Sequence, residues 1–124
     1  MLHILLITAR RERIESFVEG LCSDRKVRLD IVLSGAEALG ILQTVTPHLV
    51  IVDSTSENIE SFDLVRSIIG VNAMVNTAVA SPLSDEQFHD RGEGLGILCR
   101  VPLDPGRGDS NALLQRLRDL TATA

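Results

Sequence analysis

Aromatic side chains are nearly absent from this 124-residue sequence, which holds three phenylalanines and neither tyrosine nor tryptophan. So few aromatic rings leave little material for stacking nucleic-acid bases or for enclosing a cationic ligand. The hydrophobic core must therefore consist mainly of leucine, isoleucine, valine and alanine. Hydrophobic residues make up 44% of the chain, which is enough for one packed domain of this length.

Cysteine and positive charge are also in short supply. Cys22 and Cys99 are far apart and match no metal-binding or redox spacing. The 17 acidic and 12 basic residues give a net charge of −5, which argues against binding to nucleic acids or to anionic membranes. The apolar stretch at residues 2–7 is too short for a signal sequence or a membrane span. We therefore expect a soluble, cytoplasmic protein with free thiols and no metal site.

Short apolar stretches alternate with amphipathic stretches along the whole chain. The expected strands occupy residues 2–9, 27–33, 48–53, 74–80 and 96–101. The expected helices occupy residues 12–21, 35–45, 61–69, 84–91 and 110–120. Ser34 with Glu37, and Ser84 with Gln87, have the spacing of capping boxes at two of the helix starts. Residues 54–60 and 102–108 are expected to form loops.

Strands that alternate with helices indicate a parallel sheet covered by helices on both faces. The sequence thus predicts one (βα)₅ domain of the flavodoxin-like α/β class over residues 1–120, with strand order 2-1-3-4-5. A disordered tail is expected at residues 121–124. Functional groups in such folds gather at the carboxyl ends of the strands, which directs attention to residues 8–10, Asp53, Ser81 and residues 100–102.

One segment, Ser34–Asp53, resembles the second helix and third strand of response-regulator receiver domains, the CheY-like family; it reads SGAEALGILQTVTPHLVIVD. Residues 60–64 (ESFDL), the pair Ala80-Ser81 and residues 98–104 (LCRVPLD) also resemble segments of that family. The resemblance covers nearly the whole chain. It implies a signalling module of the two-component or phosphorelay type, which contacts other proteins and is not an enzyme.

Asp53 stands at the phospho-acceptor position that the resemblance implies, but its surroundings depart from the family pattern. The family ends its first strand with an acidic pair that holds a divalent metal, whereas this chain has Thr8 and Ala9 there, followed by Arg10. Val101 replaces the family's lysine. Mg²⁺ prefers several hard oxygen ligands, and phosphoryl transfer needs cations that neutralise charge. We therefore expect slow or absent phosphorylation and no bound cofactor, with Mg²⁺ only if the site is active.

Two roles are open for Asp53. It is either the phospho-acceptor or a strand-end carboxylate that pairs with Arg10 or Arg100 or is solvated, and we favour the second role. Arg10 is a candidate replacement for the missing cation, because a guanidinium pairs with a carboxylate or a phosphate through two hydrogen bonds. Ser81 is either a phosphoryl-oxygen ligand, as the resemblance implies, or the start of a turn before Pro82.

The favoured hypothesis is a receiver-type module that acts by protein–protein contact without standard Mg-dependent aspartyl phosphorylation. The resemblance implies a protein partner, a histidine kinase or a downstream effector, bound by the face that residues 84–91, 96–101 and 110–120 form. A homodimer through the same face is a second option, and Phe88, or no residue, stands in for the family's aromatic switch. The alternatives are an active receiver phosphorylated on Asp53 and a small flavodoxin-like ligand-binding domain or enzyme.

Overall fold

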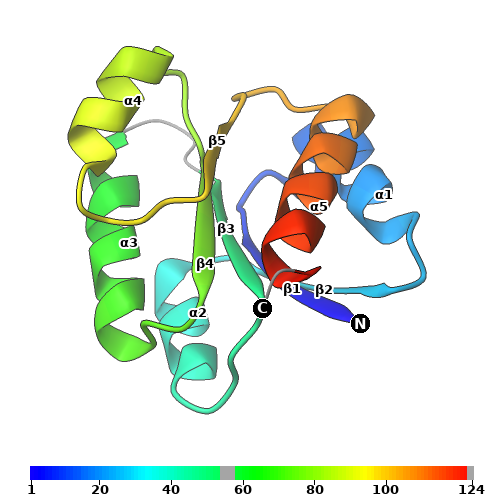
Figure 1. Cartoon of the computed structure of the whole chain (residues 1–124), viewed down its shortest axis with the longest axis horizontal. Helices are drawn as coiled ribbons and strands as arrows, with labels where there is room; N and C mark the ends of the chain where they lie inside the picture. The colour runs from blue at the N-terminus through cyan, green and yellow to red at the C-terminus, as the bar shows by residue number, and fades with distance from the viewer. Residues whose placement is uncertain (54–57, 123–124) are drawn as a thin grey trace.

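A computed structural model of the chain describes residues 1–53 and 58–122 and contains a five-stranded parallel sheet in the order β2-β1-β3-β4-β5 (Figure 1). The strands are β1 (Leu2–Ile7), β2 (Val27–Val32), β3 (Leu49–Asp53), β4 (Asn76–Ala80) and β5 (Cys99–Val101). The helices are α1 (Glu15–Cys22), α2 (Gly35–Leu42), α3 (Asn58–Val71), α4 (Asp85–Gly92) and α5 (Arg107–Ala122). The predicted α/β class and strand order are confirmed.

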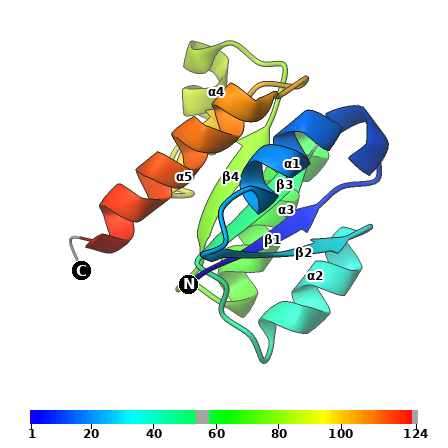
Figure 2. The ribbon, with the colours of Figure 1, turned by 90° about the vertical axis from the view of Figure 1, so that its right-hand side faces the viewer.

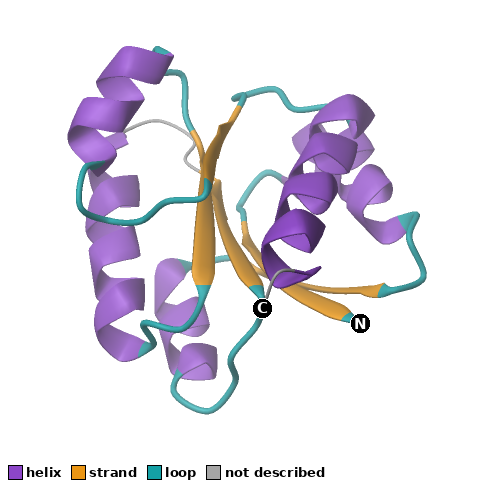
Figure 3. Ribbon diagram, viewed as in Figure 1, coloured by secondary structure: helices purple, strands orange, loops and turns teal. Residues whose placement is uncertain are grey.

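Helices cover both faces of the sheet (Figure 3). α1 and α5 lie side by side on one face (Figure 2). Phe17 and Leu117 pack there with Ile4 and Ile51 of the sheet. α2, α3 and α4 cover the other face, with a core that includes Val50. Successive side chains of a strand point to opposite faces, so the central strands supply both cores. Within the described ranges, no helix has the length and apolar character of a membrane span.

α1 and α5 come into close contact at Gly20. A Cβ atom at this position would lie 2.5 Å from Oγ of Ser110. That hydroxyl donates a hydrogen bond of 2.6 Å to the carbonyl of Phe17, so it is held in place against α1. The spacing of the two helices therefore requires glycine at position 20.

Around residues 8–14 and 54–60, the observed boundaries of strands and helices differ from the predicted ones. β1 ends at Ile7 instead of residue 9, because the N–H of Arg10 donates to Oγ of Thr8 and turns the chain. A short 3₁₀ helix, η1 (Arg11–Ile14), then precedes α1. The loop predicted over residues 54–60 is wrong for residues 58–60, which belong to α3, and residues 54–57 lie outside the described part of the chain.

Strand β5 is shorter than the predicted segment 96–101. Gly94 and Gly96 have φ angles of +83° and +64°, which belong to a turn and suit glycine. The strand therefore begins only at Cys99, and it lies at the edge of the sheet beside β4.

Helix α5 is longer at both ends than the predicted segment 110–120. It begins at Arg107, because the carboxylate of Asp109 accepts a hydrogen bond from the N–H of Gly106 at 2.8 Å and so caps the first turn. It continues to Ala122, so residues 121 and 122 are helical and not part of a disordered tail. Residues 123–124 lie outside the described part.

Candidate functional site

The carboxyl ends of the strands meet at one edge of the sheet and carry the positions selected from the sequence. Thr8 follows β1, Asp53 ends β3, Ser81 follows β4 and Val101 ends β5. In the register of the sheet, Asp53 lies opposite Ala80, and Ala80 lies opposite Val101. The predicted site positions therefore occupy neighbouring strand ends, as expected for a parallel sheet.

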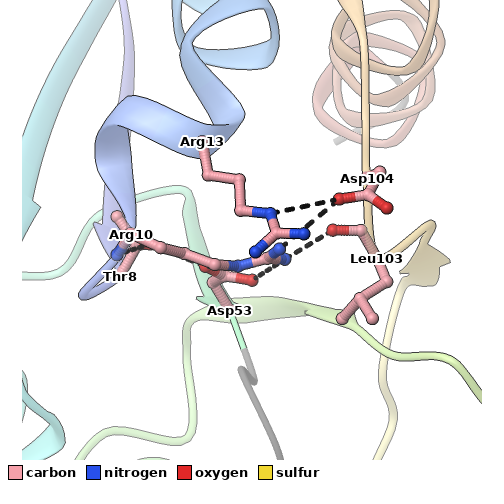
Figure 4. A network of polar contacts seen from close by, with 6 residues as sticks. All are labelled: Thr8, Arg10, Arg13, Asp53, Leu103 and Asp104. Atoms are coloured by element: carbon pink, nitrogen blue, oxygen red, sulfur yellow. Dashed lines mark hydrogen bonds and ion pairs between the residues drawn. The ribbon is translucent and has the colours of Figure 1, made fainter.

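Arg10 holds the carboxylate of Asp53 through two hydrogen bonds (Figure 4). Its Nε donates to Oδ2 at 2.8 Å, and its Nη2 donates to Oδ1 at 2.7 Å. The side chains of Arg10 and Asp53 are 14% and 2% exposed, so the pair is largely shielded from water. A planar guanidinium bound to both oxygens of a carboxylate is among the strongest polar contacts in proteins.

The hydroxyl of Thr8 adds a further hydrogen bond to the same carboxylate. It donates to Oδ2 of Asp53 at 2.6 Å, and its oxygen accepts from the N–H of Arg10 at 3.1 Å. Thr8 is buried. It therefore orients both members of the ion pair, the carboxylate directly and the arginine through its backbone.

Arg10 also contacts the loop that connects β5 to α5 (Figure 4). Its Nη2 donates to the carbonyl of Leu103, and its Nη1 lies 3.7 Å from Oδ1 of Asp104. Nε of Arg13 lies 4.0 Å from the same oxygen. Asp104 is 75% exposed, so these outer ion pairs contribute little. The hydrogen bond to Leu103 is the firmer link between Arg10 and the loop.

The ion pair fixes the charge of its cation. The hydrogen bond to Asp53 raises the pKa of Arg10 above its usual value, and the negative charges of Asp53 and Asp104 act in the same direction. Burial opposes this effect and is outweighed. Arg10 therefore keeps its positive charge across the working pH range and balances the carboxylate from within the protein.

The described residues at this edge do not fit a magnesium ion. Mg²⁺ requires a near-octahedral set of oxygen ligands, usually from carboxylates and water. Both oxygens of Asp53 already accept hydrogen bonds from Arg10, and the neighbouring Ala9 offers no side-chain ligand. In residues 1–53 and 58–122, no group of three or more His, Cys, Asp or Glu side chains could hold a metal ion.

Ser81 and Val101 are both buried beside this edge. Oγ of Ser81 accepts from the N–H of Leu83 at 3.2 Å, which is the geometry of a turn around Pro82. The N–H of Ser81 donates to the carbonyl of Val101 at 3.0 Å, and the Val101 side chain belongs to the core under α1 and α5. Val101 therefore supplies packing at the position where the family resemblance implies a lysine.

A groove of about 670 Å³ runs along β5 beside α4, and a smaller hollow of about 200 Å³ adjoins it beside α5. Cys99, Arg100 and Arg116 line both. Arg100, the other arginine considered as a partner of Asp53, donates instead to Asp85 at 3.0 Å. The groove therefore lies on the face that the family resemblance marks as the contact surface.

Phe88 of α4 is one of the residues that line this groove, but most of its side chain is buried. It is 8% exposed, and its ring centre lies 5.4 Å from that of Phe62, with the ring planes at 54°. This tilted arrangement is a favourable aromatic contact. Phe88 is consequently a core residue that fastens α4 to α3.

The loop between β5 and α5 was not recognised from the sequence as part of the site. Leu103 contributes its backbone carbonyl, and no side-chain pattern identifies such a group. Asp104 did carry a usable signal, because it follows a predicted strand at the edge where Arg10 was expected.

No protein-family model matches the sequence, and no curated protein matches it. Solved structures match its fold. A CheY-like response regulator receiver domain protein from Methanospirillum hungatei aligns with a TM-score of 0.80 and 11% identity, over 100% of this chain and 99% of its own. A two-component response regulator from Legionella pneumophila gives 0.78 and 16%, over 96% and 99%. The CheY-like protein TadZ from Pseudomonas aeruginosa gives 0.71 and 14%, over 94% and 93%. The chain has the fold of CheY-like response-regulator receiver domains.

Proposed function

We propose that this chain is a receiver-type signalling module that acts by protein–protein contact and does not use Mg-dependent phosphorylation of Asp53. The observation that carries the proposal is the ion pair in which Arg10 occupies both oxygens of that carboxylate. The fold and the response regulators that share it support the signalling role. The position of Arg10 supports the absence of Mg-dependent phosphorylation in this proposal.

The chemistry of acyl-phosphate formation explains why the arginine matters. A carboxylate oxygen must approach the phosphorus, and a metal and other cations must neutralise the charge that develops. Here Arg10 would first have to release Asp53, and separating a buried ion pair costs several kcal/mol, about 3 or more. After its release, Thr8 and Ala9 would still offer no carboxylate for the metal.

The working surface in this proposal is the face formed by α4, β5 and α5. Its groove has a mixed lining, in which Ile97 and Leu98 lie among charged residues such as Glu93. Arg116 is exposed in the groove and has no ion-pair partner among the described residues. A surface that combines Ile97 and Leu98 with the cation of Arg116, unpaired among the described residues, suits a protein partner that carries an apolar segment and a carboxylate, as a kinase or effector or as a second copy of this chain.

Phosphorylation is tested by incubating the purified protein with acetyl phosphate and Mg²⁺, with a conventional response regulator treated in parallel. Intact-mass spectrometry is expected to find the phosphoryl group on the conventional protein only. An Mg²⁺ titration by calorimetry is expected to give no saturable heat in the millimolar range. A phosphoryl group on this chain that disappears in Asp53→Asn would establish the active receiver instead.

The surface is tested by light scattering and by sedimentation of the wild type and Arg116→Glu. A wild-type dimer that Arg116→Glu dissociates supports the homodimer, and a monomer in both supports a partner of another sequence. A dimer that Arg116→Glu leaves intact would place any self-association elsewhere. Co-purification of a tightly bound small-molecule cofactor would instead favour a ligand-binding domain or enzyme.

A further inference from the structure

We propose that Arg10 couples the charge of Asp53 to the position of the loop between β5 and α5. In this proposal, the loop is held in its observed position as long as the carboxylate is charged. The inference deepens the proposed function and rests on it for its biological meaning. The coupling itself is a property of the ion pair and can be measured without knowing the partner.

The coupling begins at a single atom. Nη2 of Arg10 donates both to Oδ1 of Asp53 and to the carbonyl of Leu103. The guanidinium is planar and rigid, so the groups bound to it have a fixed spacing. If the carboxylate releases Nε and Nη2, the guanidinium is no longer oriented toward Leu103. The end of β3 and the loop are therefore held by the same guanidinium group.

The fastened loop leads directly into α5. Pro102 and Pro105 restrict the backbone on either side of Leu103, because proline fixes φ. The next residue, Gly106, donates its N–H to the carboxylate of Asp109 in the first turn of α5. A shift at Leu103 is thus transmitted to the start of the helix that lines the groove with Arg116.

The direction of the effect follows from the charges. Arg10 is held by a charged carboxylate on one side and by a neutral carbonyl on the other, and the charged contact is the stronger. Neutralising Asp53 removes the stronger contact and the orientation that it imposes. The loop is therefore expected to loosen when Asp53 loses its charge.

Hydrogen–deuterium exchange of the amides in residues 103–109 tests this coupling. The variants are Arg10→Lys, Asp53→Asn and the double variant. Arg10→Lys keeps the positive charge but cannot bind two oxygens and a carbonyl in one plane. Arg11→Lys is the matched control, because Arg11 is an exposed neighbour whose side chain has no hydrogen bond or ion pair to the described residues. The amides of α2, on the other face of the sheet, serve as the internal reference.

Each single variant is expected to speed exchange in residues 103–109 by about fivefold, the factor that corresponds to one net hydrogen bond. The double variant is expected to match the single variants, since all three break the same connection. Arg11→Lys and the α2 amides are expected to stay at wild-type rates. Should Arg10→Lys fail to fold, Asp53→Asn against Arg11→Lys makes the same comparison.

Three results would overturn the coupling: wild-type exchange in residues 103–109 in either folded single variant, effects that multiply in the double variant, or equal acceleration in α2. The outcome is distinguishable from failure of the proposed function. Phosphorylation of Asp53 with the coupling intact would reject the function and keep the coupling. Wild-type exchange rates in the variants, together with no phosphorylation of Asp53, would reject the coupling and keep the proposed function.

Discussion

Arg10 and Asp53 are 43 positions apart in the sequence, yet they form a two-point ion pair whose side chains are 14% and 2% exposed. Removing two charges from water is costly, and here the loss is offset because the carboxylate also accepts from Thr8. The pair is far more buried than the ion pair of Arg66 with Asp63, whose side chains are both more than half exposed. Because the pair is buried, removing one partner alone is expected to lower the free energy of unfolding.

The first prediction concerns Arg10→Met, which keeps most of the side-chain volume and removes the charge. It leaves a buried carboxylate without its cation and is expected to lower the free energy of unfolding by about 3 kcal/mol. Urea denaturation at neutral pH measures the change. Arg66→Met is the control and is expected to cost under about 1 kcal/mol, because its ion pair is exposed. Equal losses in the two variants would contradict the prediction.

The second prediction concerns the close contact of α1 and α5. Gly20→Ala places a Cβ atom against Ser110 and is expected to destabilise the protein by about 2 kcal/mol. Gly40→Ala is the matched control in α2, where no atom beyond the adjoining residues and the backbone of the same helix lies within 4 Å of the added carbon. It is expected to stabilise by about 0.5 kcal/mol, because alanine favours the helix. Thermal unfolding compares the two, and a stabilised Gly20→Ala would show that the helices can separate freely.

The third prediction concerns the start of α4. Oγ of Ser84 accepts a hydrogen bond from the N–H of Gln87, and Oε1 of Gln87 accepts one from the N–H of Ser84, which completes the capping box expected from the sequence. Ser84→Ala is expected to cost about 1 kcal/mol and to speed amide exchange in α4. Ser67→Ala, an exposed serine inside α3, is the control and is expected to be near neutral. An unchanged α4 in Ser84→Ala would mean that tertiary packing alone fixes this helix.

The fourth prediction concerns the two thiols. Burial raises the pKa of Cys99, and the charge of Arg116 opposes this only in part. The neutral thiol is the form that the fold favours, so its stabilising effect is present below the pKa of a free thiol and is lost as pH rises through the raised value. Alkylation by iodoacetamide, followed by mass spectrometry, is expected to modify exposed Cys22 much faster than Cys99 at pH about 8. The difference between the two alkylation rates should decrease as pH increases. Equal rates at pH about 8 would contradict a shielded Cys99.

Apolar periodicity was sufficient to predict the architecture, because buried parallel strands and amphipathic helices have different repeats. The boundaries were harder to predict where glycine replaces a capping side chain. Gly106 gives no capping signal of its own, so the start of α5 at Arg107 depended on the Asp109 carboxylate, which acts from inside the helix. The short β5 depended in the same way on backbone angles at Gly94 and Gly96.

The candidate site could be located but not assembled from the sequence. Asp53 was placed at a strand end, and pairing with Arg10 or with Arg100 remained open, since the direction of a long side chain depends on its surroundings. The structure separates the two arginines: Arg100 on the edge strand reaches α4, while Arg10 follows the strand beside β3 and reaches the carboxylate. The carbonyl of Leu103 has no signature in a sequence.

The burial of Arg10 and Asp53 sets how the protein responds to ionic strength. Dissolved ions weaken attraction between exposed charges, and they act far less on a pair that water cannot reach. Contacts such as Arg66 with Asp63 thus weaken in concentrated salt, while the ion pair of Arg10 with Asp53 keeps most of its strength. The arrangement that this arginine imposes on the sheet edge should therefore persist in brine as in dilute buffer.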